Sequence, residues 1–139
     1  MSLIRLVYAS QFAQPFNELD ALDIIEVSMV NNRKLDITGV LCYSNHYYLQ
    51  CLEGCRTEVN RLYRKICLDS RHTEPVILMY QEILHRQFDD WYMGHIPSIN
   101  ISGGTVLKYS KERHFNPYTM TPEAALKFLL ELSQINAVL

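Results

Sequence analysis

The sequence lacks an excess of charge of either sign. Its 139 residues include 13 lysines and arginines and 15 aspartates and glutamates, which gives a formal net charge of −2 at pH 7. A chain without surplus positive charge has no general attraction for nucleic acid or for an anionic membrane. It also lacks an apolar run near the ~20 residues of a membrane span, and a signal peptide pattern at its start. We therefore expect a cytoplasmic globular domain that binds neither nucleic acid nor membrane.

Cysteine patterns typical of metal sites or disulfide frameworks are also missing. The cysteines are Cys42, Cys51, Cys55 and Cys67. They contain no CxxC pair, and the five histidines show no ligand spacing. Two of the cysteines lie in expected strands and one in an expected helix. We therefore interpret most of them as small buried hydrophobic residues and predict no metal site.

Apolar periodicity predicts alternating strands and helices as far as Pro97. Strands are expected at residues 3–9, 37–43, 47–52, 76–84 and 91–96. Helices are expected after Asn17 and after Thr57, because each of these residues can cap a first helical turn. The order β-α-β-β-α-β-β predicts an α+β fold with a ferredoxin-like sheet.

The tail at residues 98–139 has a different character. A short helix is expected at 105–110, and Thr121-Pro122-Glu123 is a strong start for a last helix that is apolar nearly all round. The strands at 49–52 and 76–79 are apolar on both faces, so the sheet needs two covering layers. We expect the tail to pack opposite the first two helices, within the same structural unit. Apolar surface left on it would suit contact with another chain.

Gln50 is the most informative polar residue, because it lies within the apolar run Tyr47–Leu52. A buried carboxamide needs hydrogen-bond partners, and each unsatisfied group costs roughly 1–3 kcal/mol. Its head carries both a donor and an acceptor, so it can serve a partner in either of two orientations. The identity of that partner is therefore the central question about this core.

The first helix carries two stripes at helical spacing. The stripe expected to form ordinary core consists of Leu19, Leu22, Ile25 and Met29. The neighbouring stripe consists of Ile24, Ser28, Asn31 and Asn32. Its small polar side chains suit the wall of a site for a planar ligand with polar edges. The simpler interpretation, favoured when the helix is taken alone, is that the two asparagines only end the helix.

A basic cluster surrounds the second helix. It consists of Arg61, Arg64, Lys65 and Arg71. Such a cluster can neutralise a phosphate. It can also be a solvated face interleaved with Glu58 and Asp69, as charged runs on helices usually are. The second interpretation fits most of the cluster.

Several short motifs follow one another along the chain. They are Leu6-Val7-Tyr8-Ala9-Ser10, Asn31-Asn32 with Ile37-Thr38-Gly39, Leu49-Gln50-Cys51-Leu52-Glu53-Gly54, Asp69-Ser70-Arg71-His72 and Phe88-Asp89-Asp90-Trp91-Tyr92-Met93. In this order they resemble the BLUF domain, a blue-light sensor that uses a flavin. The tail, with Tyr109-Ser110 and Met120-Thr121-Pro122-Glu123, resembles the short stand-alone members of PixD type. The resemblance implies a flavin-binding domain at 1–97 and a helical extension at 98–139.

The resemblance also implies roles for single residues. Tyr8 matches the tyrosine that gives an electron and a proton to the excited flavin. Gln50 matches the glutamine between that tyrosine and the flavin N5 and O4 edge, and Asn32 matches the asparagine at the pyrimidine edge. Trp91 and Met93 match a pair on the last strand that reports the signal. The flavin site implied in this way consists of Ile24, Ser28, Asn31, Asn32, Gln50, Lys65, Ile66, Asp69, Arg71 and His72.

Some positions depart from the family pattern. They are His46, Tyr47, Tyr48, Gly94 and His95. Tyr48 stands where phenylalanine is usual, so it is either a competing electron donor or a ring that packs as phenylalanine does. The last two departures bear on signalling more than on flavin binding.

The expected function is light sensing without enzymatic turnover. The cofactor implied is FAD, although one basic cluster suits the phosphates of FMN equally well. The signal would leave through the tail helix or the Trp91–Met93 segment, to a second copy of the chain or to a separate protein partner. Two alternatives are an acylphosphatase-like enzyme that uses Asn31 or Arg71, and a light-insensitive interaction module with the same fold.

Overall fold

Five strands form one mixed sheet in the computed structural model, which describes residues 2–14, 17–89 and 91–135. The strands are β1 (Leu3–Phe12), β2 (Thr38–Tyr43), β3 (Tyr47–Cys55), β4 (His72–Glu82) and β5 (Gly94–Pro97). Their order in the sheet is β4-β1-β3-β2-β5, and only the pairing of β5 with β2 is parallel among these strands. The predicted α+β fold with a ferredoxin-like sheet is confirmed. Asp90 of the last motif and residues 136–139 of the tail lie outside the described residues.

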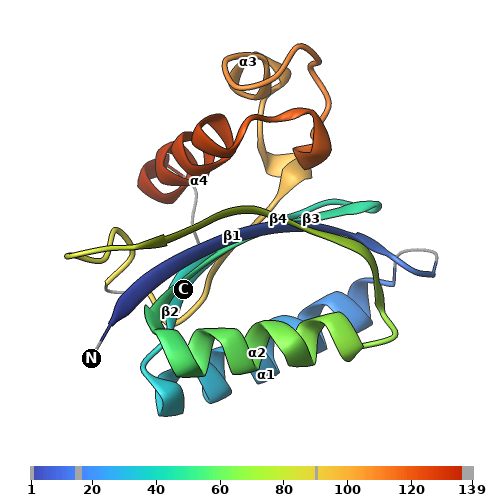
Figure 1. The fold of residues 1–139 in the computed structure, drawn as a ribbon. Helices are drawn as coiled ribbons and strands as arrows, with labels where there is room; N and C mark the ends of the chain where they lie inside the picture. Colours follow the sequence, from blue (N-terminus) through green and yellow to red (C-terminus); the bar gives the residue numbers. More distant parts are fainter. Residues whose placement is uncertain (1, 15–16, 90, 136–139) are drawn as a thin grey trace.

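Helices cover both faces of the sheet (Figure 1). One face carries α1 (Glu18–Leu35) and α2 (Arg56–Leu68). The other carries the tail, which consists of η1 (Ser98–Asn100), α3 (Gly103–Leu107), η2 (Pro117–Thr119) and α4 (Pro122–Ile135). Successive side chains of a strand point to opposite faces. Leu6 and Tyr8 of β1 therefore join the core under α1 and α2, while Val7 joins the core under α4. The tail packs opposite the first two helices, as predicted.

The first helix begins where predicted but does not end at the asparagines. The Asn17 side chain accepts from the backbone N–H of Leu19 at 2.9 Å, which caps the helix. The helix continues to Leu35 and is closed by Asp36 in the left-handed conformation. The interpretation in which Asn31 and Asn32 only end the helix is therefore wrong.

The predicted core stripe of α1 is wrong in its first turns. Leu19 and Leu22 are 76% and 47% exposed, whereas the deeply buried side of the helix carries Ile24 and Asn32 beside Ile25. Asn32 can be buried there because its amide donates to the carbonyl oxygen of Tyr92 at 3.0 Å. The buried side of the helix thus combines Ile25 and Met29 of the apolar stripe with Ile24 and Asn32 of the polar stripe, whereas Asn31 is exposed.

Pairing with β1 sets strand lengths that local periodicity does not predict. β3 extends to Cys55 because Cys55 pairs with Leu3, and β4 begins at His72, ahead of the predicted position 76, because His72 pairs with Phe12. α2 begins at Arg56 directly after Cys55 at the N-cap position, so the prediction that Thr57 caps this helix is wrong.

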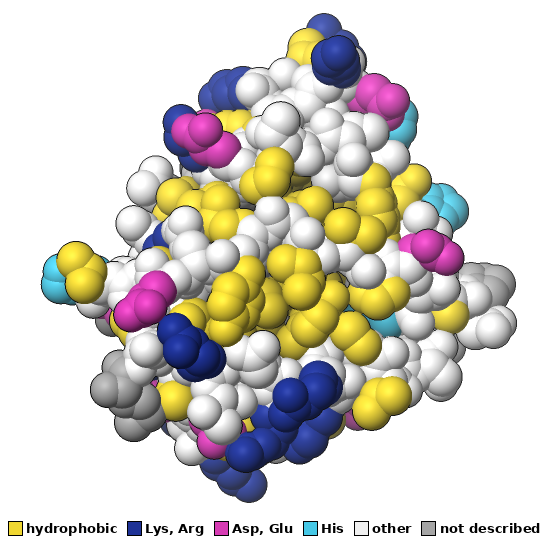
Figure 2. Space-filling view, in the orientation of Figure 1, with side chains coloured by type: hydrophobic (Ala, Val, Ile, Leu, Met, Phe, Trp, Pro, Cys, Tyr) yellow, Lys and Arg dark blue, Asp and Glu magenta, His cyan; other side chains and the backbone are white. Residues whose placement is uncertain are grey.

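β4 lies at an edge of the sheet, which corrects its predicted burial. Val76 and Ile77 are 41% and 49% exposed, because β1 is the only described strand beside β4. Figure 2 shows hydrophobic side chains gathered over the side of the molecule where β4 runs between α4 and α2. Exposed apolar surface therefore lies at this sheet edge and not only on the tail.

The burial of the cysteines, candidate metal-binding clusters and candidate membrane-spanning helices can each be checked in the structure. Cys42 and Cys51 are buried as predicted, whereas Cys55 is partly buried and Cys67 is exposed. Among the described residues, no group of histidines, cysteines and acids could hold a metal ion. The described helices include none that is long and apolar enough to cross a membrane.

Candidate functional site

A hollow of about 170 Å³ opens between α1 and α2, on the face of the sheet that these two helices cover. It is lined by Ile24, Val27, Ser28, Asn31, Asn32, Tyr48, Gln50, Leu62, Lys65, Ile66, Asp69, Arg71 and His72. All the residues of the predicted flavin site are in this lining. The lining therefore brings together side chains from four separate stretches of sequence: α1, β3, α2 and the segment from Asp69 to the start of β4 at His72.

Three lining residues were not predicted to belong to the site. Val27 lies three residues after Ile24 and four before Asn31, so helical spacing alone places it on the same side of α1. Tyr48 precedes Gln50 by two positions in β3, which places both side chains on one face of the sheet. Leu62 belongs to the apolar stripe of α2, and that pattern gives no signal that separates a ligand wall from ordinary core.

A buried chain of hydrogen bonds forms the floor of the hollow. Tyr8 in β1 and Gln50 in β3 are register partners, so their side chains point to the same face. The Tyr8 hydroxyl donates to Gln50 Oε1 at 2.5 Å, and Gln50 Nε2 donates to Met93 Sδ at 3.1 Å. Both polar atoms of the Gln50 head thus have partners, although the head also lines the hollow.

The hydroxyl of Tyr8 is held as a neutral donor. Burial raises the pKa of Tyr8 well above its ordinary value, and the neighbouring phenols Tyr48 and Tyr63 add to this effect. Their rings surround it, with the Tyr63 ring edge-on at 5.2 Å and the Tyr48 ring stacked at 6.4 Å between centroids. The phenol therefore stays protonated and donates to Gln50 throughout the physiological pH range.

Asn32 has a buried acceptor atom that lacks a hydrogen-bond donor among the described residues. Its Nδ2 donates to the Tyr92 carbonyl oxygen, but its Oδ1 is buried without a partner among the described residues. Buried acceptors in proteins are nearly always satisfied. A planar heterocycle with an N–H at its edge, such as the pyrimidine ring of a flavin, would supply the missing donor. The side chains present in this hollow therefore fit a flavin.

Trp91 and Met93 lie before the last strand, which corrects their predicted place on it. The Trp91 carbonyl oxygen accepts from the Gly39 N–H at 2.9 Å, but the ladder with β2 begins only at Gly94. Met93 packs into the core under α1 and α2, where it meets Gln50. Trp91 packs against the core under α4, with its ring 6.5 Å from that of Phe88. This short segment therefore touches both faces of the sheet.

The basic cluster divides into two parts. Arg61 pairs with Glu58 on the exposed side of α2, and Arg64 is also exposed, as expected for a solvated face. Lys65 and Arg71 instead line the hollow. Hydrogen bonds from Arg71 hold the pKa of Asp69 below its ordinary value. Nearby, His72 Nδ1 lies 3.0 Å from Ser10 Oγ, and burial lowers the pKa of this histidine.

Comparison with known proteins agrees with this geometry. The family model described as BLUF, sensors of blue-light using FAD, matches residues 3–94. The photoactivated adenylate cyclase subunit beta of Euglena longa is 30% identical over 136 residues, which cover 93% of this chain and 16% of that protein. The corresponding subunit of Euglena gracilis is 29% identical with the same coverage. The chain thus spans only 16% of the length of these curated relatives.

Solved structures give the same result. BlsA in its photo-activated state is 31% identical, with a TM-score of 0.85 over 99% of both chains. BlrB in its dark state is 32% identical, with a TM-score of 0.69 over 72% of this chain and 76% of that one. Klebsiella pneumoniae BlrP1 with FMN and cyclic diGMP is 30% identical, with a TM-score of 0.66 over 76% of this chain and 28% of that one. The chain therefore belongs to the BLUF family, the sensors of blue light that use FAD.

Proposed function

We propose that this chain is a blue-light sensor that binds a flavin between α1 and α2 and signals by rearranging the bonds of Tyr8 and Gln50. The observation that carries this proposal is the buried chain Tyr8–Gln50–Met93 at the floor of the hollow. A bound flavin supplies the absorption of blue light and an electron acceptor in its excited state. Ile24 and Ile66 would hold its flat faces, and Asn32 Oδ1 would accept from its pyrimidine edge.

The switch itself would be made by side chains of this chain. On illumination Tyr8 would give an electron to the excited flavin while its phenolic proton moves along the bond to Gln50 Oε1, and both would return to Tyr8 before the cycle ends, so that the chain undergoes no net oxidation. The carboxamide head can then exchange the atom that faces Tyr8, either by rotation or by a change of tautomer. After rotation Nε2 would donate to the Tyr8 oxygen and Met93 Sδ would lose its donor, so the two arrangements make different sets of bonds, as a two-state element requires.

The segment from Trp91 to Met93 is our candidate for carrying the signal across the sheet. An exchange of the Gln50 head replaces the N–H that now reaches Met93 Sδ. Trp91, two residues earlier, lines a hollow of about 260 Å³ with Phe88 and with Leu130 and Ser133 of α4. A shift of Met93 would therefore move a residue in contact with the tail. We propose that the tail passes the signal to a second copy or to a separate protein partner.

The first test is the colour of the purified chain. After incubation with FAD and removal of free flavin, the protein is expected to be yellow. Blue light should shift its flavin absorption slightly to the red, and the original spectrum should return in the dark. The reason is that the rearranged bonds act on the polar edge of the ring. A preparation that stays colourless with FAD, FMN and riboflavin would rule out the sensor. FAD is the resident flavin that we propose, from the family description, and the flavin released on denaturation of protein purified without added flavin tests this.

Gly94 gives a test of the proposed route, because Trp91 is the only tryptophan in the sequence. A Cβ atom at position 94 would lie 2.3 Å from Cε3 of the Trp91 ring, so Gly94→Ala must displace this ring. We expect a changed Trp91 fluorescence spectrum with an unchanged red shift of the flavin, and a loss of the response of the tail to light in hydrogen exchange. The control is Gly104→Ala, where the nearest atom to the new Cβ is 3.8 Å away. Unchanged tail exchange in Gly94→Ala would count against the route.

A further inference from the structure

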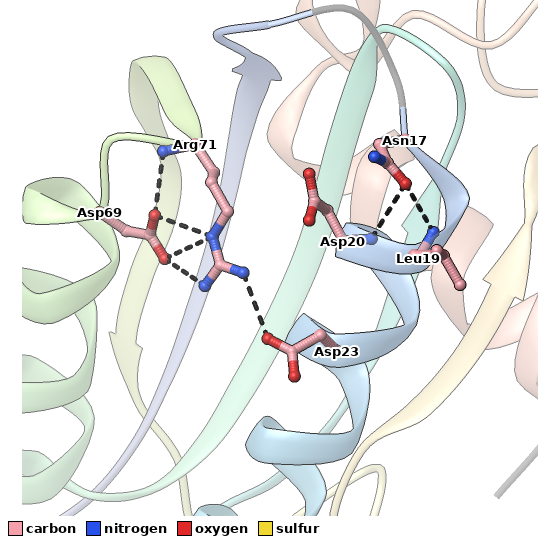
Figure 3. Close-up of polar contacts among 6 residues, drawn as sticks. All are labelled: Asn17, Leu19, Asp20, Asp23, Asp69 and Arg71. Atoms are coloured by element: carbon pink, nitrogen blue, oxygen red, sulfur yellow. Dashed lines mark hydrogen bonds and ion pairs between the residues drawn. The ribbon is translucent and has the colours of Figure 1, made fainter.

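One arginine joins both walls of the hollow at its outer end (Figure 3). Arg71 lies between α2 and β4, and its guanidinium donates to the Asp69 carboxylate with distances of 2.8 to 3.2 Å. Across the gap, Arg71 NH1 donates to Asp23 Oδ2 of α1 at 3.5 Å. The contact with Asp23 is the longer of the two, and the Asp23 side chain is 66% exposed. It is therefore the contact that gives way more easily to another anion.

Arg71 also lies where the hollow meets a second one. A second, smaller hollow is lined by Phe12, Gln14, Asn17, Asp20, Ile24 and Arg71. It shares Ile24 and Arg71 with the hollow described above. A ligand whose ring lies beside Ile24 and whose side chain points outward along this path must therefore pass the guanidinium.

The charges along this path are mostly negative. The guanidinium of Arg71 is bonded to Asp69 on one side and to Asp23 on the other (Figure 3), and Asp20 lines the smaller hollow with it, while Lys65 is the other cation of the larger hollow. The positive end of α1 is also engaged, because the N–H groups of Leu19 and Asp20 both donate to the Asn17 side chain. An incoming phosphate would meet a cation that is already paired and a carboxylate across the gap.

Riboflavin, FMN and FAD share the same ring and differ at the outer end of the side chain, which would lie near Arg71. Riboflavin ends in a hydroxyl group, FMN in a phosphate, and FAD in a diphosphate that carries adenosine. We propose that Asp23 is a specificity-determining residue, which competes with the phosphate of FMN or FAD for Arg71 and so lowers their affinity relative to riboflavin. This proposal rests on the proposed function, since it assumes that the hollow binds the flavin ring.

Asp23→Asn tests the proposal, because it removes the charge and keeps the shape of the side chain. Dissociation constants for riboflavin, FMN and FAD would be measured by quenching of flavin fluorescence. We expect FMN and FAD to bind the variant about two- to fivefold more tightly, the range expected for a partly exposed charge pair, with riboflavin unchanged. The gain should shrink at high salt, which screens exposed charges.

Two further variants separate competition from other effects. Glu26→Gln removes an exposed charge from the next turn of α1, outside both linings, and should change none of the three constants. In an Arg71→Gln background, Asp23→Asn should gain less, because the guanidinium for which Asp23 competes is gone while Lys65 is unchanged. If all three dissociation constants changed equally, or if those for FMN and FAD did not change, the proposed role of Asp23 would be overturned. The proposed function would not be affected by this result. Failure of every flavin to bind the unmodified chain would overturn the proposed function with it.

Discussion

Tyr8→Phe is expected to abolish the light-induced red shift while the flavin stays bound. The Tyr8 ring is fully buried below the hollow and is not part of its lining, so the ring that packs there is kept. The hydroxyl that is removed is the donor to Gln50 Oε1. Without it, this position has neither the phenolic proton nor a readily oxidised side chain. The measurement is the difference spectrum between blue light and dark, recorded on samples with equal flavin content.

The matched controls are the two tyrosines whose rings touch Tyr8. Tyr48→Phe and Tyr63→Phe remove the same single oxygen from the same aromatic cluster. Both are expected to keep the red shift, because their hydroxyls are not the donor to Gln50. The Tyr48 variant also decides whether this departure from the family pattern is a competing electron donor, since loss of a competitor would raise the yield of the shift. A normal shift in Tyr8→Phe would contradict the proposed photochemistry.

Tyr8→Phe is also expected to lower the free energy of unfolding, and this loss must be measured before the spectra are compared. Tyr8→Phe leaves the buried Gln50 Oε1 without its donor, which costs about 1–3 kcal/mol. Urea unfolding with bound flavin measures this loss. Because bound ligand stabilises the folded state by mass action, flavin concentration must be the same for each variant. A loss of flavin on gentle warming would then reflect stability and not the photochemistry.

Much of the site could be predicted because its polar residues stand out against apolar surroundings. Gln50 in an apolar strand, and Asn31 and Asn32 on an amphipathic helix, each break a local pattern. The structure places all three in one lining. The sequence could not show that Asn32 is buried, because the group that makes this possible is the carbonyl oxygen of Tyr92, 60 positions away. Periodicity measures apolar content and not such distant partners.

The ends of strands were less predictable for a related reason. The extents of β3 and β4 follow β1, whose ends pair with Cys55 and His72. Apolar periodicity assigns the segment between β4 and β5 partly to each strand, because its apolar residues resemble strand residues. It is instead held in place by side chains that come from β3 and from its own arginine, and Glu53 is the centre of that arrangement.

Glu53→Gln is expected to lower the free energy of unfolding by about 3–5 kcal/mol, the cost of breaking a buried ion pair. Glu53 is fully buried, and Oε2 accepts from Arg5 at 2.8 Å. Oε1 accepts from the backbone N–H groups of Gln87 and Phe88 at 2.8 and 2.9 Å. The neutral amide leaves the Arg5 charge buried without its counterion. Urea unfolding measures the change, and the midpoint of thermal unfolding should fall by roughly 10 °C or more.

An exposed glutamate on the same sheet provides the control. Glu82 of β4 pairs with Arg56 at 3.3 Å, with both side chains more than half exposed. Glu82→Gln should therefore change the free energy of unfolding by less than about 1 kcal/mol. If the two variants lost the same stability, the buried pair would not have the importance that its burial indicates.

The bonds to Gln87 and Phe88 give Glu53 a second effect, on the segment that contains Trp91 and Met93. Arg86 helps to hold this segment by donating to the carbonyl oxygens of Asp36 and Glu53 at 2.8 and 3.1 Å. If Glu53 served only to neutralise Arg5, the double variant Arg5→Met/Glu53→Gln would recover both stability and the normal fluorescence of Trp91. Because the carboxylate also accepts from two backbone N–H groups, we expect part of the stability to return while the Trp91 spectrum stays shifted. Full recovery of both would show that the segment is held without Glu53.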